Sequence, residues 1–378
     1  MLREMAAAAL AYEFPPVTVA SGPLLERAEA LVRSGRFDDA VDELADVWDE
    51  VRADDRLALR HQLALAWAEM YRGDLDEADA ALVCGQQIAW SAHFDAADRA
   101  EVLYQQGCVA FKRADVAGAT ELFTRALETN LRSPKPRPLL AAHAHEWRSR
   151  CHQFTRDWDA AARDAERSLE LGLDARDELS QAHALFQLSL VAERRCDWTG
   201  ARDAALRALE IYRRHGDGLA TARMLNNLGG IEFLLGNTDA AVARLMEATE
   251  AAAHAGSDAD LAQAANSLAQ VYLRTGRPAE ARARALRAVD VLAGRVDFLD
   301  ELGNAELIVA ESLASEGDIG NAERWLDAAE QTFSALGSTS HLANVWIARG
   351  DVERAAGRTD AAADSYRRAA GALADVHF

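Results

Sequence analysis

The chain of 378 residues is longer than most single domains, and half of its residues are hydrophobic although only 7% are aromatic. Its 61 acidic and 41 basic residues give a net charge of −20, which excludes non-specific nucleic-acid binding over the whole surface, because such binding depends on neutralising phosphates. The presence of only seven prolines and 23 glycines argues against a loop-rich β protein and favours long helices.

The N-terminal stretch resembles a signal peptide only in part. Glu4 stands where a positive charge is expected, and no small-residue cleavage site follows. No apolar run approaches the roughly 18–20 residues that span a bilayer. The four cysteines contain no CxxC pair, which predicts reduced thiols. We therefore expect a cytoplasmic protein that does not bind a membrane.

Residues 1–20 precede the repeats and are interpreted as a cap, a docking tail or the remnant of a longer protein. From there a six-residue pattern recurs: a small or polar residue, any residue, an apolar residue, two variable residues and alanine. Its closing alanines are separated by 38 to 42 residues, and a fixed period in this range predicts a solenoid. They are Ala40, Ala78, Ala119, Ala161, Ala201, Ala241, Ala281, Ala322 and Ala362.

A second column keeps the same phase, twelve residues before each closing alanine, and it always holds a small residue. Its members are Ala28, Ala66, Gly107, Ser149, Ser189, Gly229, Ala269, Ala310 and Gly350. Apolar residues recur between the columns at steps of three and four. Each repeat is therefore predicted to be two antiparallel helices joined by a tight turn, with small residues where the helices cross.

These columns resemble the tetratricopeptide repeat, whose signature is a small residue, a Gly-x-aromatic/aliphatic turn and two later alanines. The resemblance covers residues 24–376, and its clearest copy is 228–241. Here the period is about 40, and the terminal proline of the common form is missing, so we expect longer helices. Arg156 and Cys196 replace the turn glycine in repeats 4 and 5. The resemblance implies an all-α, right-handed superhelical solenoid of about nine helix-turn-helix repeats.

A proline-rich segment at residues 133–138 interrupts the array, because proline lacks an amide donor and disfavours helix in the residue before it. It separates repeats 1–3, predicted at 21–132, from repeats 4–9, predicted at 139–378. The segment is interpreted either as a hinge or as a longer, stiff loop between repeats.

Motifs for catalysis and cofactors are missing from the sequence, including the P-loop and the HExxH and GxSxG patterns. The one cluster of soft ligands is His143, His145, Cys151 and His152, and only His145 and His152 share a helical face. We therefore expect neither an enzyme nor a metal or cofactor site.

The tetratricopeptide resemblance implies that the first helices of successive repeats line a concave groove. Seven Arg or Lys residues and five Asp or Glu residues occupy the groove positions of repeats 2–9, although the whole chain is acid-rich. These side chains are expected to stay solvated and unpaired until a ligand binds. The residues predicted to form a peptide-binding site in repeats 4–7 are His143, Arg150, Phe154, His183, Phe186, Arg194, Arg223, Asn226, Phe233, Asn266 and Arg274.

Those residue types suit a peptide. An amide can donate to a carbonyl and accept from an N–H together, arginine captures carboxylates, and aromatic rings supply contact area. The sequence therefore predicts a non-enzymatic protein–protein interaction module that binds a partner's peptide segment bearing acidic or carboxylate groups.

The resemblance leaves one alternative open, the ligand- or peptide-sensing half of a bacterial transcription regulator without its DNA-binding domain. No helix-turn-helix unit breaks the repeat phase, so direct nucleic-acid contact is not expected. Homodimerisation through the end repeats is a further hypothesis, because a last helix with Tyr366, Leu373 and Val376 needs a cover.

Overall fold

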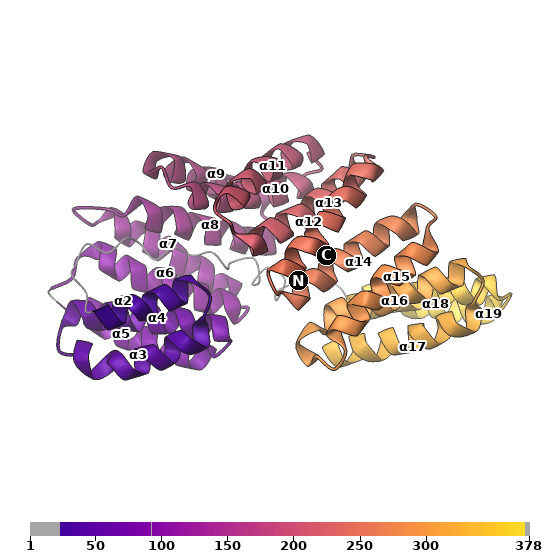
Figure 1. Cartoon of the computed structure of the whole chain (residues 1–378), viewed down its shortest axis with the longest axis horizontal. Coiled ribbons are helices and arrows are strands. Elements are labelled where there is room, and N and C mark those ends of the chain that lie inside the picture. Colours follow the sequence, from indigo (N-terminus) through magenta and orange to yellow (C-terminus); the bar gives the residue numbers. More distant parts are fainter. Residues whose placement is uncertain (1–22, 92, 375–378) are drawn as a thin grey trace. The chain divides into compact units, whose positions relative to one another are not determined.

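The computed structural model describes residues 23–91 and 93–374. The interpretations of residues 1–20 and of Val376 lie outside these ranges. Within them the chain is all-α, with eighteen α-helices, one short 3-10 helix and no strand (Figure 1). None of the described helices is long and apolar enough to cross a membrane. The chain forms two compact units, unit 1 up to Ala220 and unit 2 from Thr221.

The helices pair into hairpins along the chain, and those pairs are the predicted repeats. Unit 1 contains α2 (Pro23–Arg33), α3 (Phe37–Val51), α4 (Asp55–Arg72), α5 (Leu75–Ala89), α6 (Ala96–Lys112), α7 (Val116–Leu131), α8 (Pro138–Phe154), α9 (Trp158–Ala175), α10 (Glu178–Arg194) and α11 (Trp198–Arg214). The helix α12 (Gly218–Leu234) opens unit 2, followed by α13 (Thr238–His254), α14 (Asp258–Arg274), α15 (Pro278–Leu292), the 3-10 helix η1 (Val296–Phe298), α16 (Leu299–Ser315), α17 (Ile319–Leu336), α18 (Thr339–Ala355) and α19 (Thr359–Ala374).

The column of small residues marks the point where the two helices of a hairpin cross. A Cβ atom added to Gly107 would lie 2.6 Å from the ring of Phe123, and one added to Gly229 would lie 2.4 Å from Leu245. In repeat 4 the column residue is Ser149, whose hydroxyl donates to the carbonyl of the closing alanine, 2.8 Å away. The predicted repeat phase is therefore confirmed in both units.

The turn inside each hairpin uses a residue in the left-handed conformation, and repeats 3, 4 and 5 adopt it without glycine, with Ala114 at φ 67° in repeat 3. Arg156 has φ 61° and Cys196 has φ 60°, close to the 82° of Gly236 at the matching position of repeat 6. A side chain in this conformation costs about 1–2 kcal/mol. The next residue then caps the second helix, as Asp197 does by accepting from the N–H of Gly200 at 2.9 Å.

The proline-rich segment before α8 is tied down at both ends. The Asn130 side chain donates to the carbonyl of Arg137 at 3.0 Å and accepts from its N–H at 2.9 Å. Ser133 donates to Asp95 at 3.1 Å, and the Arg137 guanidinium pairs with Asp98. These bonds hold the segment against α6, as a stiff loop requires. The division of the repeats at this loop stays a prediction.

Candidate peptide-binding surface

The predicted groove residues all lie on first helices of hairpins. In unit 1 they are His143, Arg150 and Phe154 on α8 and His183, Phe186 and Arg194 on α10, and these two helices are in contact. In unit 2 they are Arg223, Asn226 and Phe233 on α12 and Asn266 and Arg274 on α14.

Arg150 belongs to a buried polar layer between α8 and α10. Its Nε donates to Glu146 at 2.6 Å, and Gln187 of α10 donates to the same carboxylate at 2.8 Å. Gln153 completes the layer by donating to Gln187 at 2.9 Å. Arg150 is only 4% exposed and its guanidinium stacks on the Trp147 ring. The expectation of a solvated, unpaired arginine is wrong here, because a buried guanidinium needs an anion beside it.

The two histidines of the unit 1 set lie at matching positions on neighbouring helices. His143 Nε2 lies 3.0 Å from the hydroxyl of Ser180, and the ring of His183 lies 5.9 Å from that of Tyr212. Burial lowers the pKa of His143 to about 4. Burial, with His143 nearby, lowers the pKa of His183 to about 3. Both imidazoles are therefore neutral at pH 7 and add no positive charge for an acidic partner.

The other three residues of the unit 1 set differ in exposure. Phe186 is buried, and Phe154 is partly buried against the main apolar core of the unit. Arg194 is exposed at the end of α10. Of the six predicted residues in this unit, Arg194 is thus the one whose charge is presented to solvent.

In unit 2, Arg223 fastens α12 to α14. Its guanidinium makes two bonds to the carboxylate of Asp260, at 2.7 and 3.1 Å. The two side chains are 11% and 8% exposed. Arg223 is therefore needed between the helices, which corrects the expectation that its charge waits for a ligand. Sequence reasoning missed Asp260 because the two residues lie 37 positions apart on different helices.

Asn226 and Asn266 stand forty residues apart at the same repeat position. The amide nitrogen of Asn266 donates to the carbonyl of Glu301 at 2.8 Å. The side-chain oxygens of Asn226 and Asn266 are both buried, and neither accepts a hydrogen bond from the part of the chain that is described. A buried acceptor left without a donor costs about 1–3 kcal/mol. Two such acceptors therefore stand at the same repeat position of neighbouring first helices, beneath the surface of unit 2.

The same helices carry a cation on an aromatic ring. The guanidinium carbon of Arg274 lies 4.9 Å from the ring centroid of Phe233. Arg274 is exposed and Phe233 is partly exposed. Gly230, between Asn226 and Phe233 on one face of α12, is exposed, and a Cβ added to it would meet no atom within 4 Å. We call Asn226, Gly230, Phe233, Asn266 and Arg274 the α12–α14 surface.

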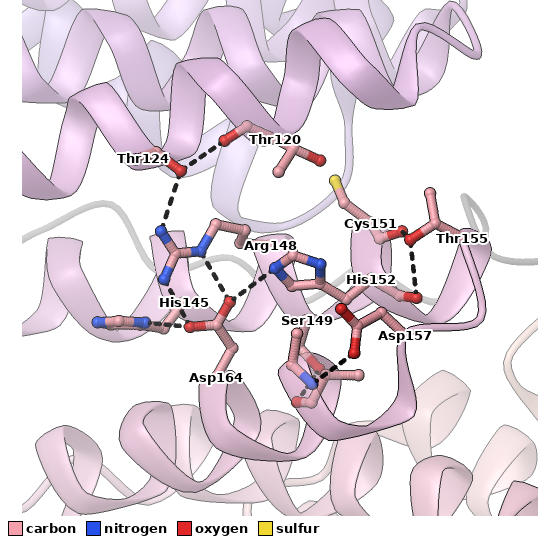
Figure 2. A network of polar contacts seen from close by, with 12 residues as sticks. Thr120, Thr124, His145, Arg148, Ser149, Cys151, His152, Thr155, Asp157 and Asp164 are labelled. Carbon is pink, nitrogen blue, oxygen red and sulfur yellow. Dashed lines mark hydrogen bonds and ion pairs between the residues drawn. The ribbon is translucent and has the colours of Figure 1, made fainter.

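A polar network on the opposite side of α8 was missed in part (Figure 2). His145 and His152 share a face, as predicted, and both approach the carboxylate of Asp164 on α9, at 2.8 and 3.5 Å. Arg148 donates to both oxygens of Asp164 at 2.7 Å. Across residues 23–91 and 93–374, no group of three or more His, Cys, Asp or Glu side chains is arranged to hold a metal ion.

The fold and this surface define a class of protein, the α-solenoid built from tetratricopeptide-type hairpins. Residues 220–293, from α12 to the end of α15, match the family model of the tetratricopeptide repeat. The resemblance inferred from the repeat columns is therefore confirmed. A search of curated protein sequences finds no match.

Three solved structures show how far the fold is shared. The apo form of the quorum sensor NprR from B. thuringiensis is 11% identical with a TM-score of 0.68, and the alignment covers 93% of this chain and 97% of that one. The Rap conjugation gene regulator of plasmid pLS20, solved with the Phr* peptide, is 12% identical with a TM-score of 0.56, covering 93% and 94%. A signal transduction ATPase with a tetratricopeptide repeat sensor from Pyrococcus horikoshii is 13% identical with a TM-score of 0.65, covering 98% and 68%.

Proposed function

We propose that this chain is a non-enzymatic interaction module that binds a linear peptide segment of a partner on the α12–α14 surface. The observation that carries the proposal is the exposed guanidinium of Arg274 above the partly exposed ring of Phe233. The same two helices carry Asn226 and Asn266, whose buried side-chain oxygens accept no hydrogen bond. Backbone N–H groups of an extended peptide are donors of the required kind. Such a donor would reach these oxygens once the two amide groups turn toward the peptide, and the hydrogen bonds formed need no particular peptide sequence.

Side-chain preference would come from Phe233 and Arg274. The partly exposed ring offers apolar contact area, and the exposed guanidinium above it can pair with a carboxylate. We therefore expect a peptide with an acidic or C-terminal carboxylate group near an apolar side chain. Arg150 and Arg223 are not assigned to the ligand, because Arg150 is already paired within α8 and Arg223 already links α12 to α14.

The structural relatives support a peptide as the ligand. One of them was solved with the Phr* peptide, and another is a quorum sensor. They share this fold at 11 to 12% identity over more than nine-tenths of the chain, so the support concerns the architecture and not individual residues.

A second candidate is the sensing half of a regulator. The solved ATPase that has a tetratricopeptide repeat sensor favours it, because that protein combines a sensor of this fold with further domains. In this reading the same surface binds the ligand, and the signal passes to another domain or chain. The two candidates separate when the ligand is known, since a sensor's ligand is a free peptide and a scaffold's ligand is part of a larger protein.

Selection from a library of displayed linear peptides tests the proposal. The wild-type chain should enrich a common motif, and Asn226→Ala should lose most of the enrichment. Asn237→Ala is the matched control, since Asn237 is an exposed turn residue of the same unit and should behave as wild type. Enrichment on Asn226→Ala equal to wild type would remove the α12–α14 surface as the binding site.

A further inference from the structure

The helix α8 carries three imidazoles on two faces. His145 and His152 point toward Asp164 of α9, and His143 points toward Ser180 of α10. All three rings are partly buried. Neither the repeat pattern nor the proposed peptide site, which lies in unit 2, requires this arrangement.

The carboxylate of Asp164 already has a full set of donors. Oδ1 accepts from Nδ1 of His145 and from Arg148, and Oδ2 accepts from Nε of Arg148. Arg148 also donates to the hydroxyl of Thr124 at 3.0 Å, so the network joins α7, α8 and α9 (Figure 2). His152 Nε2 lies 3.5 Å from Oδ2. One negative charge thus faces a permanent positive charge and two bases that can each gain a proton.

The groups around His152 would stabilise its protonated, positively charged form only poorly. The charges that act on it are those of Asp164, Arg148, Asp157 and Arg163, which sum to zero. Burial lowers the pKa of His152, although Asp164 opposes the shift. Burial alone would raise the pKa of Asp164, but hydrogen bonds from Arg148 and His145 hold it below its ordinary value. The carboxylate therefore stays ionised while the imidazole stays neutral.

His143, on the other face, is in a similar position. The groups that face it are Ser180 and His183 of α10, Asp177 before α10, and the Tyr104 ring of α6 at 6.4 Å. Asp177 is the one anion among them, and burial outweighs it. The same contact holds Glu146, which is already paired with Arg150, and Arg150 further lowers the pKa of His183. A proton on His143 or on His183 would therefore place a second positive charge in the contact between α8 and α10.

We propose that α8 is an acid-sensitive element of unit 1, whose packing against α9 and α10 loosens between pH 7.5 and pH 5.5 while unit 2 keeps its structure. An imidazole that is neutral when folded and takes a proton at about 6.5 when unfolded stabilises the fold fully above that pH and ceases to do so as the pH falls. At pH 5.5 each such ring lowers the folded-to-unfolded ratio about 11-fold. Asp164 acts only below about pH 4 and does not contribute in this window.

Unit 2 offers the internal comparison. His254 is exposed on α13, with Nδ1 2.8 Å from a backbone carbonyl of its own helix. His341 lies 3.0 Å from the carboxylate of Asp300, which becomes an ion-pair partner when the ring gains a proton. Protonation of either ring puts no unpaired charge into a helix contact.

Hydrogen exchange of the full chain, followed by mass spectrometry at pH 7.5 and pH 5.5 and corrected for intrinsic exchange rates, tests the proposal. Peptides from residues 138–194 should lose protection at least tenfold at the lower pH, and peptides from residues 299–355 should not. The variant His143→Gln/His152→Gln should lose much less, because an amide takes no proton. His254→Gln is the control and should match wild type.

Equal loss in both units, or no loss in either, would overturn the proposal. So would a double variant that loses protection as wild type does. If the double variant does not fold, the single variant His152→Gln should also lose less protection than wild type at pH 5.5, by a smaller margin. The imidazole proton resonances of the wild-type chain then decide: His152 titrating at or above the ordinary histidine pKa of about 6.5 would contradict the account.

Discussion

The two units use the same repeat position differently. Fifteen residues before the closing alanine, unit 1 has Glu146 in repeat 4, buried and bonded to Arg150 and Gln187. At that position unit 2 has Asn226 and Asn266, whose side-chain oxygens accept nothing. The position in the repeat therefore determines where a side chain lies. The neighbouring helix determines whether that side chain already has a hydrogen-bond partner. The contrast concerns this repeat position, because unit 1 also has a buried acceptor without a donor elsewhere, Oε1 of Gln105.

The units also differ in how protons act on them. Burial lowers the pKa of four histidines in unit 1, His61, His143, His152 and His183. In unit 2, burial, with Asp351 nearby, raises the pKa of Glu311 to about 7. Acidification therefore destabilises unit 1 through its imidazoles, although burial also raises the pKa of its Glu69, Glu146 and Glu193, which act in the opposite direction. In unit 2, acidification is stabilising through Glu311. The following predictions are given in order of the expected effect.

Removing the anion of the buried layer should affect unit 1 most. Glu146→Ala leaves the Arg150 charge buried without its partner, and we expect a loss of about 3–5 kcal/mol in the free energy of unfolding. Denaturant unfolding measures this change. Glu178→Ala, which removes an exposed partner of Arg214, should leave the transition where it is. Equal effects of the two substitutions would mean that the layer is not a closed ion pair.

Filling a helix crossing should damage unit 2 by overpacking. In Gly229→Leu the first added carbon would already lie 2.4 Å from Leu245, so we expect a loss of about 3 kcal/mol. The adjacent Gly230 faces open space, so Gly230→Ala should stabilise the helix by about 1 kcal/mol. Thermal unfolding of both variants checks the contrast, and a stable Gly229→Leu protein would show that the repeat phase is wrong.

Replacing Glu311 with glutamine should remove the pH dependence that this carboxyl gives to the stability of unit 2. Its folded pKa of about 7 lies above the ordinary value for glutamate, so its contribution to stability is full below about pH 4.5 and is lost as the pH rises to 7. Glu311→Gln should therefore stabilise the chain by about 2 kcal/mol at pH 8 and have little effect at pH 5. Unfolding at the two pH values measures this difference. A gain of the same size at both would contradict the assignment.

Restoring a turn glycine should give the smallest change. Cys196 adopts the left-handed conformation of Gly236, so Cys196→Gly should stabilise unit 1 by about 1 kcal/mol. The reverse exchange at the matching turn of unit 2, Gly236→Ala, should cost a similar amount. A shift of the unfolding midpoint in opposite directions is the expected result, and shifts in the same direction would rule out turn strain as the cause.

The fold was predictable because it depends on periods within one sequence. Two sequence features are enough to locate the described hairpins. They are the column of small residues, which includes Gly107 and Gly229, and the closing alanines. The state of the site residues was not predictable in the same way. Arg223 pairs with Asp260, which lies 37 residues further along the chain. The sequence of one helix reveals neither the ion-pair partner of Arg223 nor the burial of its side chain.

The buried polar layer between α8 and α10 was predictable from the sequence in part. Glu146 and Arg150 are four residues apart on one helix, a spacing that predicts an ion pair. The burial of this ion pair depends on α10 of the next repeat, whose Gln187 donates to Glu146. Asp164 was missed for the same reason, since its partners His145 and Arg148 lie on the preceding helix.

The central claim is that the unpaired side-chain oxygens of Asn226 and Asn266 turn to accept backbone donors from a bound peptide. The most direct test is a double-mutant cycle between Asn226→Ala and single N-methylations along a peptide selected on the wild-type chain, with affinities from calorimetric titration. N-methylation removes one donor at a time. The account predicts a coupling of about 1–2 kcal/mol at one backbone amide and near zero at the others. Coupling near zero at every amide of the peptide would contradict it.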